Sequence, residues 1–407
     1  MNNSKVRVLL VSSQVIPHVG GLSTHFLLLE STLRQRAALA GVVTGADVDL
    51  GLVQQARLSV LRLAGPDVAR KNILETTRRR LSEKLQSMLQ GRDTPDLIHC
   101  HDPLAGVAAH IALGQAAISV PVVQTVHGPA SREAIMGGAA PDGRHVSCIR
   151  RLEEYSFAAA THLIAVDHGQ ADIMSTDFHV PVEKITVVPN GTDIAAVAAL
   201  GESRSPVEIG EPYFLVPRRL VKKNGVEVAL DAIASLRSST LLAVAGNGPL
   251  RPQLERAAMA LGVAHRVRFL GNLPPTVVLP LMRRALGVVI PSIPVDGVVE
   301  ATSLAALESM ACGTPIIASD IGGLREIVSR AKVGFLFPAG DAMALASAMR
   351  ELEAMPAGEL ALLQRRTQTA AEAFDVRHWF SAINTVYTEA VAARNALTLS
   401  TVRSQYQ

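Results

Sequence analysis

Two carboxylates eight residues apart carry the most informative chemistry in the sequence. The residues between Glu300 and Glu308 are uncharged, and their apolar positions recur at helical spacing. At 3.6 residues per turn, this spacing predicts a helix on which the two carboxylates lie about 80° apart around the axis. Thr302 and Ser303 would open the helix and leave backbone N–H groups free. The pattern favours an extended ligand, with hydroxyls at one end and a phosphate near the helix start. The alternative is a pair of glutamates on a solvent-exposed face.

A basic segment follows a predicted strand in the second half of the chain. Arg218, Arg219, Lys222 and Lys223 place four cations in six positions. Arginine can bind a phosphate through paired hydrogen bonds, and lysine acts as a point charge. Ligands of open parallel sheets bind at the carboxyl ends of the strands. We therefore expect these cations to face a diphosphate, with a solvated basic loop as the alternative.

A glycine pair lies between the first predicted strand and the helix that follows it. Gly20 and Gly21 precede a run whose apolar positions keep helical spacing from Leu22 to Leu33. Glycines let the backbone approach a ligand closely, and the N–H groups at a helix N-terminus favour an anion. A phosphate site and a simple tight turn are both open. The segment is neither a G-x-G-x-x-G dinucleotide fingerprint nor a P-loop.

Histidines end two further predicted strands. His99 and His101 share one face of a strand because they are two residues apart, and His127 follows the next strand along the chain. Neutral imidazole is a common metal ligand, but the sequence offers no evident third ligand for His99 and His101. We therefore expect no metal site. His127 fits a hydrogen-bond donor beside a ligand, with an ordinary loop histidine as the alternative.

Short apolar runs must position these residues. The runs predicted as strands are Val6–Val11, Asp96–Cys100, Val120–Thr125, Leu163–Val166, Ile185–Val188, Tyr213–Val216, Leu241–Ala245, Val267–Leu270, Gly287–Ile290 and Pro315–Ala318. Helical patterns separate most of them, which indicates parallel sheets covered on both faces. The fold class is therefore α/β, with two doubly wound Rossmann-like domains. We expect a site in the cleft between the carboxyl edges of their sheets.

A glycine- and proline-rich stretch at 198–212 is the expected domain boundary. The predicted organisation is one Rossmann-like domain at 1–200, a second at 201–375 and a C-terminal helix at 376–407. That helix would pack back toward the first domain.

Composition excludes several classes of protein. Of 407 residues, 48% are hydrophobic and 18% charged, which excludes a disordered chain. Aromatics are only 3% and the net charge is +3, so a nucleic-acid partner is not expected. The three cysteines, Cys100, Cys148 and Cys312, have no disulfide or zinc spacing, which fits a cytoplasmic protein. The sequence has no run of 18 apolar residues, so we expect no transmembrane helix.

The longest motif resembles a known enzyme family. The run from Glu300 to Val328 is similar to the E-x7-E region of family 4 glycosyltransferases, which are retaining nucleotide-sugar enzymes of the GT-B fold. Further stretches resemble family motifs in the same order along the chain. They are Gly20-Gly21 with His25, Thr125-Val-His127-Gly, Val188-Pro-Asn190-Gly191-Thr-Asp193, Arg219-Leu-Val-Lys-Lys-Asn-Gly and Ala245-Gly-Asn247-Gly-Pro-Leu.

The resemblance implies a donor, an acceptor and roles for the motif residues. The donor is a nucleotide-diphosphate sugar, with a UDP- or GDP-sugar expected, and the acceptor is a hydroxyl of a glycan, glycolipid or small metabolite. Glu308 would accept hydrogen bonds from the ribose, and His127 would lie near the donor sugar. The implied catalytic set is His127, Glu300, Arg219 and Lys223. The implied donor-binding set is Gly20, Gly21, Arg219, Lys222, Lys223, Asn247, Glu300, Thr302, Ser303, Leu304 and Glu308. No metal or other cofactor is implied.

Two departures and one further feature qualify the resemblance. Ala301-Thr302-Ser303 replaces the family's frequent Gly-Phe-Gly, and Asn224 stands where many relatives place a lysine before Gly225. Which of the two lysines reaches the phosphate therefore stays open.

A basic amphipathic stretch at 70–84 suggests weak peripheral contact with the inner face of a membrane, or else a solvated helix. A non-catalytic sugar-nucleotide-binding module and a sugar-nucleotide epimerase are the alternative functions.

Overall fold

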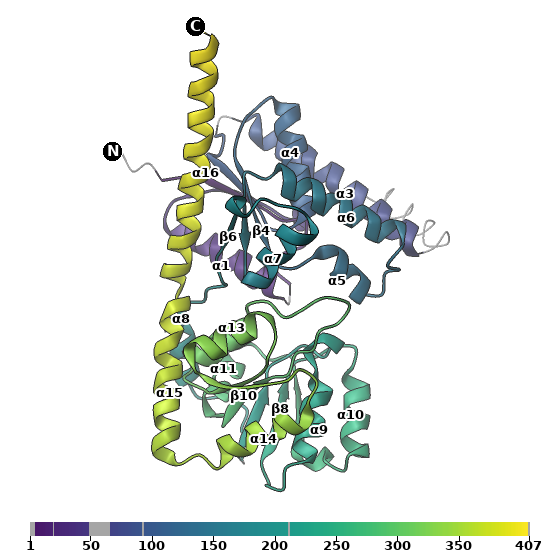
Figure 1. Cartoon of the computed structure of the whole chain (residues 1–407), viewed down its shortest axis with the longest axis vertical. Helices are drawn as coiled ribbons and strands as arrows, with labels where there is room; N and C mark the ends of the chain where they lie inside the picture. Colours follow the sequence, from purple (N-terminus) through teal and green to yellow (C-terminus); the bar gives the residue numbers. More distant parts are fainter. Residues whose placement is uncertain (1–4, 19, 49–65, 92, 211, 406–407) are drawn as a thin grey trace. The chain divides into compact units, whose positions relative to one another are not determined.

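The computed structural model describes residues 5–18, 20–48, 66–91, 93–210 and 212–405, with side chains as far as residue 395. Contacts divide the chain into two compact units (Figure 1). The first unit comprises Met1–Pro189 together with Phe380–Gln407, and the second comprises Asn190–Trp379.

The first unit contains a six-stranded sheet in the order β2-β1-β3-β4-β5-β6, and every pairing in it is parallel. Its strands are β1 Val8–Val11, β2 Leu39–Val43, β3 Leu97–Cys100, β4 Val122–Val126, β5 His162–Ala165 and β6 Ile185–Val187. Its helices are α1 Gly21–Gln35, α3 Pro66–Leu89, α4 Pro103–Ala116, α5 Ala130–Met136, α6 Arg144–Ala159 and α7 His168–Asp177. Most of α16, Val376–Gln405, also belongs to this unit.

The second unit contains another parallel sheet, in the order β12-β11-β10-β7-β8-β9. Its strands are β7 Tyr213–Val216, β8 Leu241–Ala245, β9 Val267–Gly271, β10 Gly287–Ile290, β11 Ile316–Ser319 and β12 Gly334–Phe337. Its helices are α8 Ile194–Glu202, α9 Val226–Ala234, α10 Arg251–Ala260, α11 Pro275–Arg284, α12 Leu304–Ala311, α13 Gly322–Ala331, α14 Ala342–Glu353 and α15 Ala357–Ala371. The predicted α/β class with two doubly wound sheets is confirmed.

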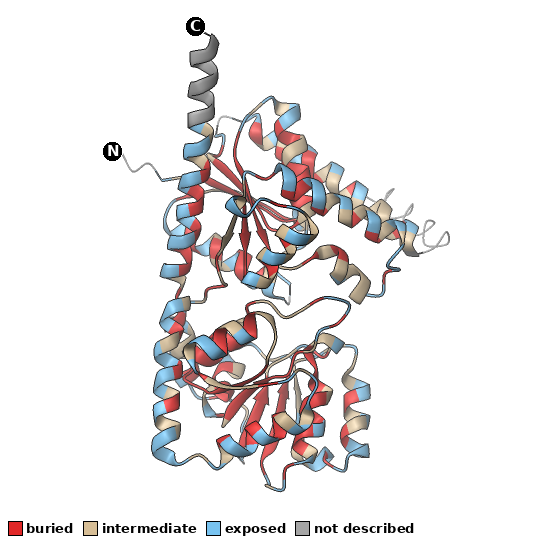
Figure 2. Ribbon diagram, in the orientation of Figure 1, coloured by how far each residue is buried: buried red, intermediate tan, exposed pale blue. Residues whose placement is uncertain are grey.

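The sheets are covered on both faces, as fully apolar strands require (Figure 2). In β7 the side chains of Phe214 and Val216 join one hydrophobic cluster, and those of Tyr213 and Leu215 join another. This alternation follows from the two-residue period of a strand. Both clusters consist of side chains under 9% exposed.

Aspartates start several of the helices and tie them to the sheet. Asp102, the N-cap of α4, accepts a hydrogen bond from the Ala105 N–H at 2.9 Å. Its second oxygen accepts from the Ser12 hydroxyl at 2.9 Å and the Ser13 N–H at 2.7 Å. Asp102 therefore joins the segments that leave β1 and β3, in addition to capping its own helix.

All ten predicted strands are present, with ends that differ by two residues at most. The sequence analysis missed β2 and β12, the strands at one edge of each sheet. Both are only partly buried over most of their length, and each contains a glycine, a residue that is depleted in strands.

The structure divides the chain after Pro189, earlier than the expected boundary at residue 200. The segment after Pro189 belongs to the second unit because α8 packs against α11 and α12. Asn190 also donates to the Thr302 carbonyl oxygen at 3.0 Å. At the other end, the ring of Phe380 in α16 lies 4.6 Å from the Arg36 guanidinium, within the first unit.

The basic stretch at 70–84 lies in α3. The apolar face expected there is partly used by the protein itself, because Leu81 and Leu85 are fully buried in the core of the first unit. Ile73 and Leu74 are half-buried. Among the described residues, no helix combines the length and apolar character needed to cross a membrane.

Gly225 permits a close approach between two loops of the second unit. Its φ is +57°, and a Cβ atom at this position would lie 1.9 Å from the Pro291 carbonyl oxygen. The loop after β7 can therefore lie against the loop after β10 only with glycine here.

Replacing Gly225 with alanine should lower the free energy of unfolding of the second unit by more than the matched change Gly262→Ala. Gly262 also has positive φ, +72°, but open space around its missing Cβ, so the control measures the left-handed backbone alone. That backbone term is about 1–2 kcal/mol. Thermal unfolding midpoints of the two variants test this, and equal losses would contradict the close approach.

Candidate functional site

The strand orders locate one switch point in each sheet. In the first unit the chain leaves β1 toward β2 and then returns to the other side of β1 as β3. In the second unit β10 returns beside β7 in the same way. Ligands of doubly wound sheets bind outside the carboxyl ends of the strands at such points. Both switch points carry the polar residues described below.

An ion pair between Arg218 and Glu300 occupies the switch point of the second sheet. Arg218 follows β7, and Glu300 lies in the loop after β10. The two guanidinium NH2 groups donate to the two carboxylate oxygens at 2.9 and 2.8 Å. The side chains are only 9% and 13% exposed. A bidentate pair of this kind fixes both the position and the plane of the carboxylate.

Three other polar groups surround the guanidinium of Arg218. It donates to Asn224 Oδ1 at 2.7 Å, Ser292 Oγ at 2.9 Å and Ser303 Oγ at 3.3 Å. Asn224 ends the short 3-10 turn η4, Lys222–Asn224, and its amide also donates to the Arg219 carbonyl oxygen at 2.7 Å. Asn224 therefore holds the arginine.

The charge state of Glu300 follows from these contacts. Burial alone would raise the pKa of this carboxyl. The Arg218 charge and its hydrogen bonds, together with the Lys223 charge and a hydrogen bond from Ser303, outweigh burial and lower the pKa below its ordinary value. Glu300 is therefore a fixed anion at neutral pH.

The helix predicted across Glu300 and Glu308 is shorter than expected. It begins at Leu304, with Ser303 as its N-cap, so Glu300 lies in the preceding loop. The expected 80° separation around one helix axis was therefore wrong. Ion pairing with Arg218 keeps Glu300 outside the helix, and the Gly323 N–H donates to its carbonyl oxygen at 3.2 Å. Gly322, with φ +43°, permits this approach, because a Cβ there would lie 2.2 Å from that oxygen.

The basic loop contributes its cations unequally. Arg219 and Lys222 are exposed, whereas Lys223 is half-buried. The charge of Lys223 helps to lower the pKa of Glu300. The Lys223 carbonyl oxygen accepts a hydrogen bond from the Ile293 N–H at 2.8 Å. Of the two lysines, Lys223 is therefore the one whose charge acts on the buried Glu300.

Glu308 lies half-buried in α12, within an otherwise uncharged helix. Burial raises its pKa to about 7. A carboxyl with this pKa is about half ionised at neutral pH, so an added hydrogen-bond donor would shift it toward the charged form.

The other donor-binding candidates of the second unit lie near this loop system. Thr302 and Ser303 are buried, and Leu304 begins α12. Asn247 is exposed, and its carbonyl oxygen accepts from the Leu220 N–H at 3.0 Å. The turn after β8 is thereby attached to the basic loop.

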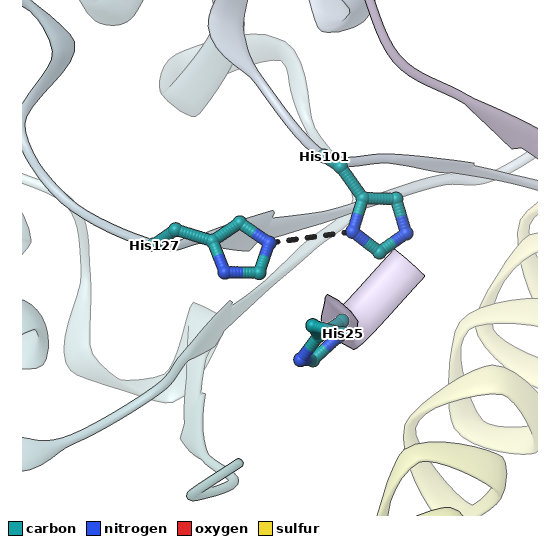
Figure 3. Close-up of side chains that lie close together, drawn as sticks. All are labelled: His25, His101 and His127. Carbon is teal, nitrogen blue, oxygen red and sulfur yellow. Dashed lines mark hydrogen bonds between the residues drawn. The ribbon is translucent and has the colours of Figure 1, made fainter. Parts of the chain in front are cut away.

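Three histidines meet at the switch point of the first sheet (Figure 3). His25 comes from α1, His101 follows β3 and His127 follows β4. His101 Nδ1 and His127 Nε2 are 3.4 Å apart, and the ligand atoms of all three histidines lie within 4.8 Å of one another. The sequence analysis found no third ligand because His25 lies 76 positions before His101 in the chain.

His99 supports this cluster from within the sheet. Its ring stacks on that of His101, with centroids 4.4 Å apart, which confirms that the two share one face of β3. His99 Nδ1 lies 2.6 Å from the Tyr387 hydroxyl of α16, and Nε2 lies 2.8 Å from the Thr125 hydroxyl. Both ring nitrogens of His99 are therefore engaged, and neither faces the cluster as a ligand.

The histidines after the strands are neutral at physiological pH. Burial first, and the neighbouring histidines second, lower the pKa values of His99, His101 and His127 well below the usual value. At the switch point of the first sheet His101 and His127 are therefore uncharged imidazoles, in contrast to the ion pair of the second.

The glycine turn lies beside the same edge of the first sheet. Gly20 is the N-cap of α1, which has no side-chain cap, and a Cβ on Gly21 would meet nothing within 4 Å. This leaves space at the start of a 15-residue helix, as an anion site requires.

Comparison with known proteins agrees with this arrangement. The family model "Glycosyltransferase Family 4" matches residues 19–196, and "Glycosyl transferases group 1" matches residues 202–373. The chain belongs to glycosyltransferase family 4. The two family models together cover both sheets except β1, which lies before residue 19.

Curated relatives of this family 4 chain share about a third of the aligned residues. "Glycogen synthase" of Mycobacterium tuberculosis is 32% identical over 283 residues, which is 68% of this chain and 64% of that protein. "D-inositol 3-phosphate glycosyltransferase" of Acidothermus cellulolyticus is 30% identical over 319 residues, 74% of this chain and 68% of that protein. The chain thus spans less than two thirds of the mycobacterial relative.

Solved structures share the fold at lower identity. Sucrose-phosphate synthase from Thermosynechococcus elongatus has a TM-score of 0.73 at 19% identity, with 95% of this chain and 100% of that chain covered. Anabaena HepE in complex with UDP-glucose has a TM-score of 0.68 at 20% identity, with 95% and 99% covered. The predicted GT-B fold class is confirmed.

Replacing Arg218 alone should lower the stability of the second unit more than neutralising both partners of the ion pair. Arg218→Met leaves Glu300 buried without its partner, and we expect a loss of about 3–5 kcal/mol in the stability of the second unit. The double variant Arg218→Met/Glu300→Gln should recover part of this loss because no uncompensated charge remains. Urea unfolding of wild type, both single variants and the double variant measures the coupling. Strictly additive losses would contradict the pair's role.

Proposed function

We propose that this chain is a retaining hexosyltransferase that takes its sugar from a UDP- or GDP-sugar and passes it to a hydroxyl of a glycan, glycolipid or small metabolite. Membership of family 4 supports the reaction class. Two relatives are named glycogen synthase and D-inositol 3-phosphate glycosyltransferase. A protein of the same fold has been solved in complex with UDP-glucose. The observation that carries the proposal is the fixed, charged Glu300 at the switch point of the second sheet, with Lys223 beside it.

The proposed chemistry needs stabilisation of a leaving diphosphate. Breaking the bond between sugar and phosphate moves an electron pair onto the diphosphate and leaves positive character on the sugar. Lys223 and Arg219 neutralise the diphosphate, helped by the N–H groups at the start of α1 near Gly20 and Gly21. Fixed cations of this kind do the work that a metal ion does in other transferases. The proposed reaction therefore uses no metal.

The carboxylates and His127 have different tasks in this proposal. Glu308 accepts hydrogen bonds from the ribose hydroxyls, and Glu300 orients the donor sugar or its phosphate. Because Glu300 already shares both oxygens with Arg218, we assign it a binding role and not that of a nucleophile. Neutral His127 donates a hydrogen bond to the donor sugar and stabilises the reacting centre.

A donor screen followed by a turnover assay tests the proposal. Thermal shift with UDP-, GDP-, ADP- and dTDP-sugars identifies the nucleotide, and release of the nucleoside diphosphate is then followed with EDTA present. His127→Gln should keep nucleotide affinity and lose about 10²-fold or more in turnover. His110→Gln, in α4 of the same unit, should leave both unchanged. Tight nucleotide binding without turnover on any acceptor would favour a non-catalytic binding module, and interconversion of the free sugar nucleotide would favour an epimerase.

The pKa of Glu308 predicts a pH dependence for nucleotide binding. If the ionised carboxyl accepts the ribose hydrogen bonds, affinity rises as pH rises through about 7, since the raised pKa leaves Glu308 largely neutral below that pH. Between pH 6 and pH 8 the ionised fraction rises by about tenfold, and the affinity should follow it.

Calorimetric titration with the nucleotide across this pH range measures the effect. Glu308→Gln is the matched control, because it keeps the shape of the side chain and cannot ionise. The ratio of wild-type to variant affinity removes the ionisation of the phosphate itself. A ratio that stays constant from pH 6 to pH 8 would exclude Glu308 from the ribose site.

A further inference from the structure

The histidine cluster of the first unit has the composition of a transition-metal site. His25, His101 and His127 come from three separate elements that meet at the carboxyl edge of the sheet (Figure 3). Imidazole nitrogens suit Zn²⁺, Cu²⁺, Ni²⁺ and Co²⁺, and they do not suit Mg²⁺ or Ca²⁺, which prefer oxygen ligands. Three histidines with a fourth, open position form a known type of zinc site.

Two of the three ligand atoms already have the separation that a tetrahedral zinc site requires. A Zn–N bond of about 2.0–2.1 Å gives tetrahedral ligand atoms about 3.3–3.4 Å apart. His101 Nδ1 and His127 Nε2 are 3.4 Å apart. The largest separation within the three-histidine set is 4.8 Å, so at least one ligand must move inward by about 1.4 Å, which rotation of a side chain about χ1 and χ2 can supply.

The surroundings hold one of these ligands in place. The His101 ring stacks on His99 and also meets the edge of Phe26, with centroids 4.9 Å apart. His99 is itself bound at both nitrogens by Tyr387 and Thr125. A ligand fixed by its neighbours loses less entropy when a metal binds.

We propose that His25, His101 and His127 bind one late first-row divalent metal ion, of which Zn²⁺ is the representative, with water in the fourth position. We also propose that the bound ion inhibits sugar transfer. The second statement rests on the proposed function, because it depends on His127 acting at the donor sugar.

The inhibition follows from the lone pair that the metal takes. In the metal-free protein one of the two facing nitrogens of His101 and His127 carries the shared proton. Metal binding requires lone pairs on both, so that proton moves to the far nitrogen of the same ring and each imidazole stays neutral. His127 Nε2 is then bonded to the ion and carries no proton, so it cannot donate the hydrogen bond to the donor sugar that the proposed function assigns to His127. Zinc should therefore inhibit and chelation should not, in line with the proposed sugar transfer that needs no metal.

Metal binding is measured without any assay of activity. Protein lacking a polyhistidine tag is stripped with EDTA, dialysed and titrated with Co²⁺, whose visible absorption reports tetrahedral nitrogen ligation. Wild type should take up one equivalent, and Zn²⁺ should displace it. His101→Gln and His25→Gln should each lose at least about tenfold in affinity. His110→Gln, which removes a histidine of the same unit outside the cluster, should bind like wild type.

Two results would overturn the site. One is the absence of saturable binding near one equivalent. The other is equal affinity in wild type, His101→Gln and His25→Gln, with thermal unfolding showing that the variants are folded. Two variants are used so that misfolding of one does not decide the result.

Inhibition is tested separately in the turnover assay. Zn²⁺ should lower the rate to an extent that follows occupancy of the site, EDTA should restore it, and Mg²⁺ should have no effect. Co²⁺ binding without inhibition by Zn²⁺ would keep the site and overturn the inhibition. Stoichiometric binding to a protein with no transferase activity would keep the site and overturn the proposed function.

Discussion

The ion pair between Arg218 and Glu300 is the interaction on which the candidate donor site depends. Removing two charges from water costs several kcal/mol for each ion, and a buried pair is stable only when its geometry is good and its remaining hydrogen-bonding groups are satisfied. Here the pair is bidentate, and Asn224, Ser292 and Ser303 accept further hydrogen bonds from the two terminal nitrogens of the arginine, which leaves only its buried Nε without a partner among the described residues. The same contacts hold together the loops after β7 and β10 and the start of α12. The position of a negative charge and the shape of the surrounding backbone are thus set by one interaction.

The two units share a topology, but the polar side chains at their switch points differ in charge. Each sheet reverses its strand order at one point and places polar residues there. In the second unit these are a buried ion pair and the half-buried Lys223, all of them charged groups. In the first unit they are imidazoles that burial keeps neutral. Neutral imidazoles can donate a hydrogen bond without repelling the positive character of a reacting sugar, and they can alternatively bind a metal ion. The units differ because a buried group keeps its charge only when it is paired with an opposite charge, as Glu300 is with Arg218.

Much of the architecture was predictable because central parallel strands have a strong sequence pattern. The strands β7, β8 and β10 match their predicted bounds, and the residues that follow them include most of the site. Ser303 was expected at the start of α12 and is its N-cap, but the position of Glu300 outside the helix was not predictable from helical spacing, because its partner Arg218 lies 82 positions away in the chain. The sequence analysis chose Arg219 from the basic run, whereas Arg218 is the residue paired with Glu300. The bond between His99 and Tyr387 spans 288 positions, and no local pattern indicates it.

The most direct test of the account is a crystal structure of the chain with the nucleoside diphosphate that stabilises it best in the thermal shift screen. The account predicts the diphosphate at the loop of residues 218–225 with Lys223 in contact, the ribose hydroxyls on Glu308, and the pair of Arg218 and Glu300 intact. A nucleotide bound away from the carboxyl ends of β7 and β10, or one whose binding separates Arg218 from Glu300, would contradict it.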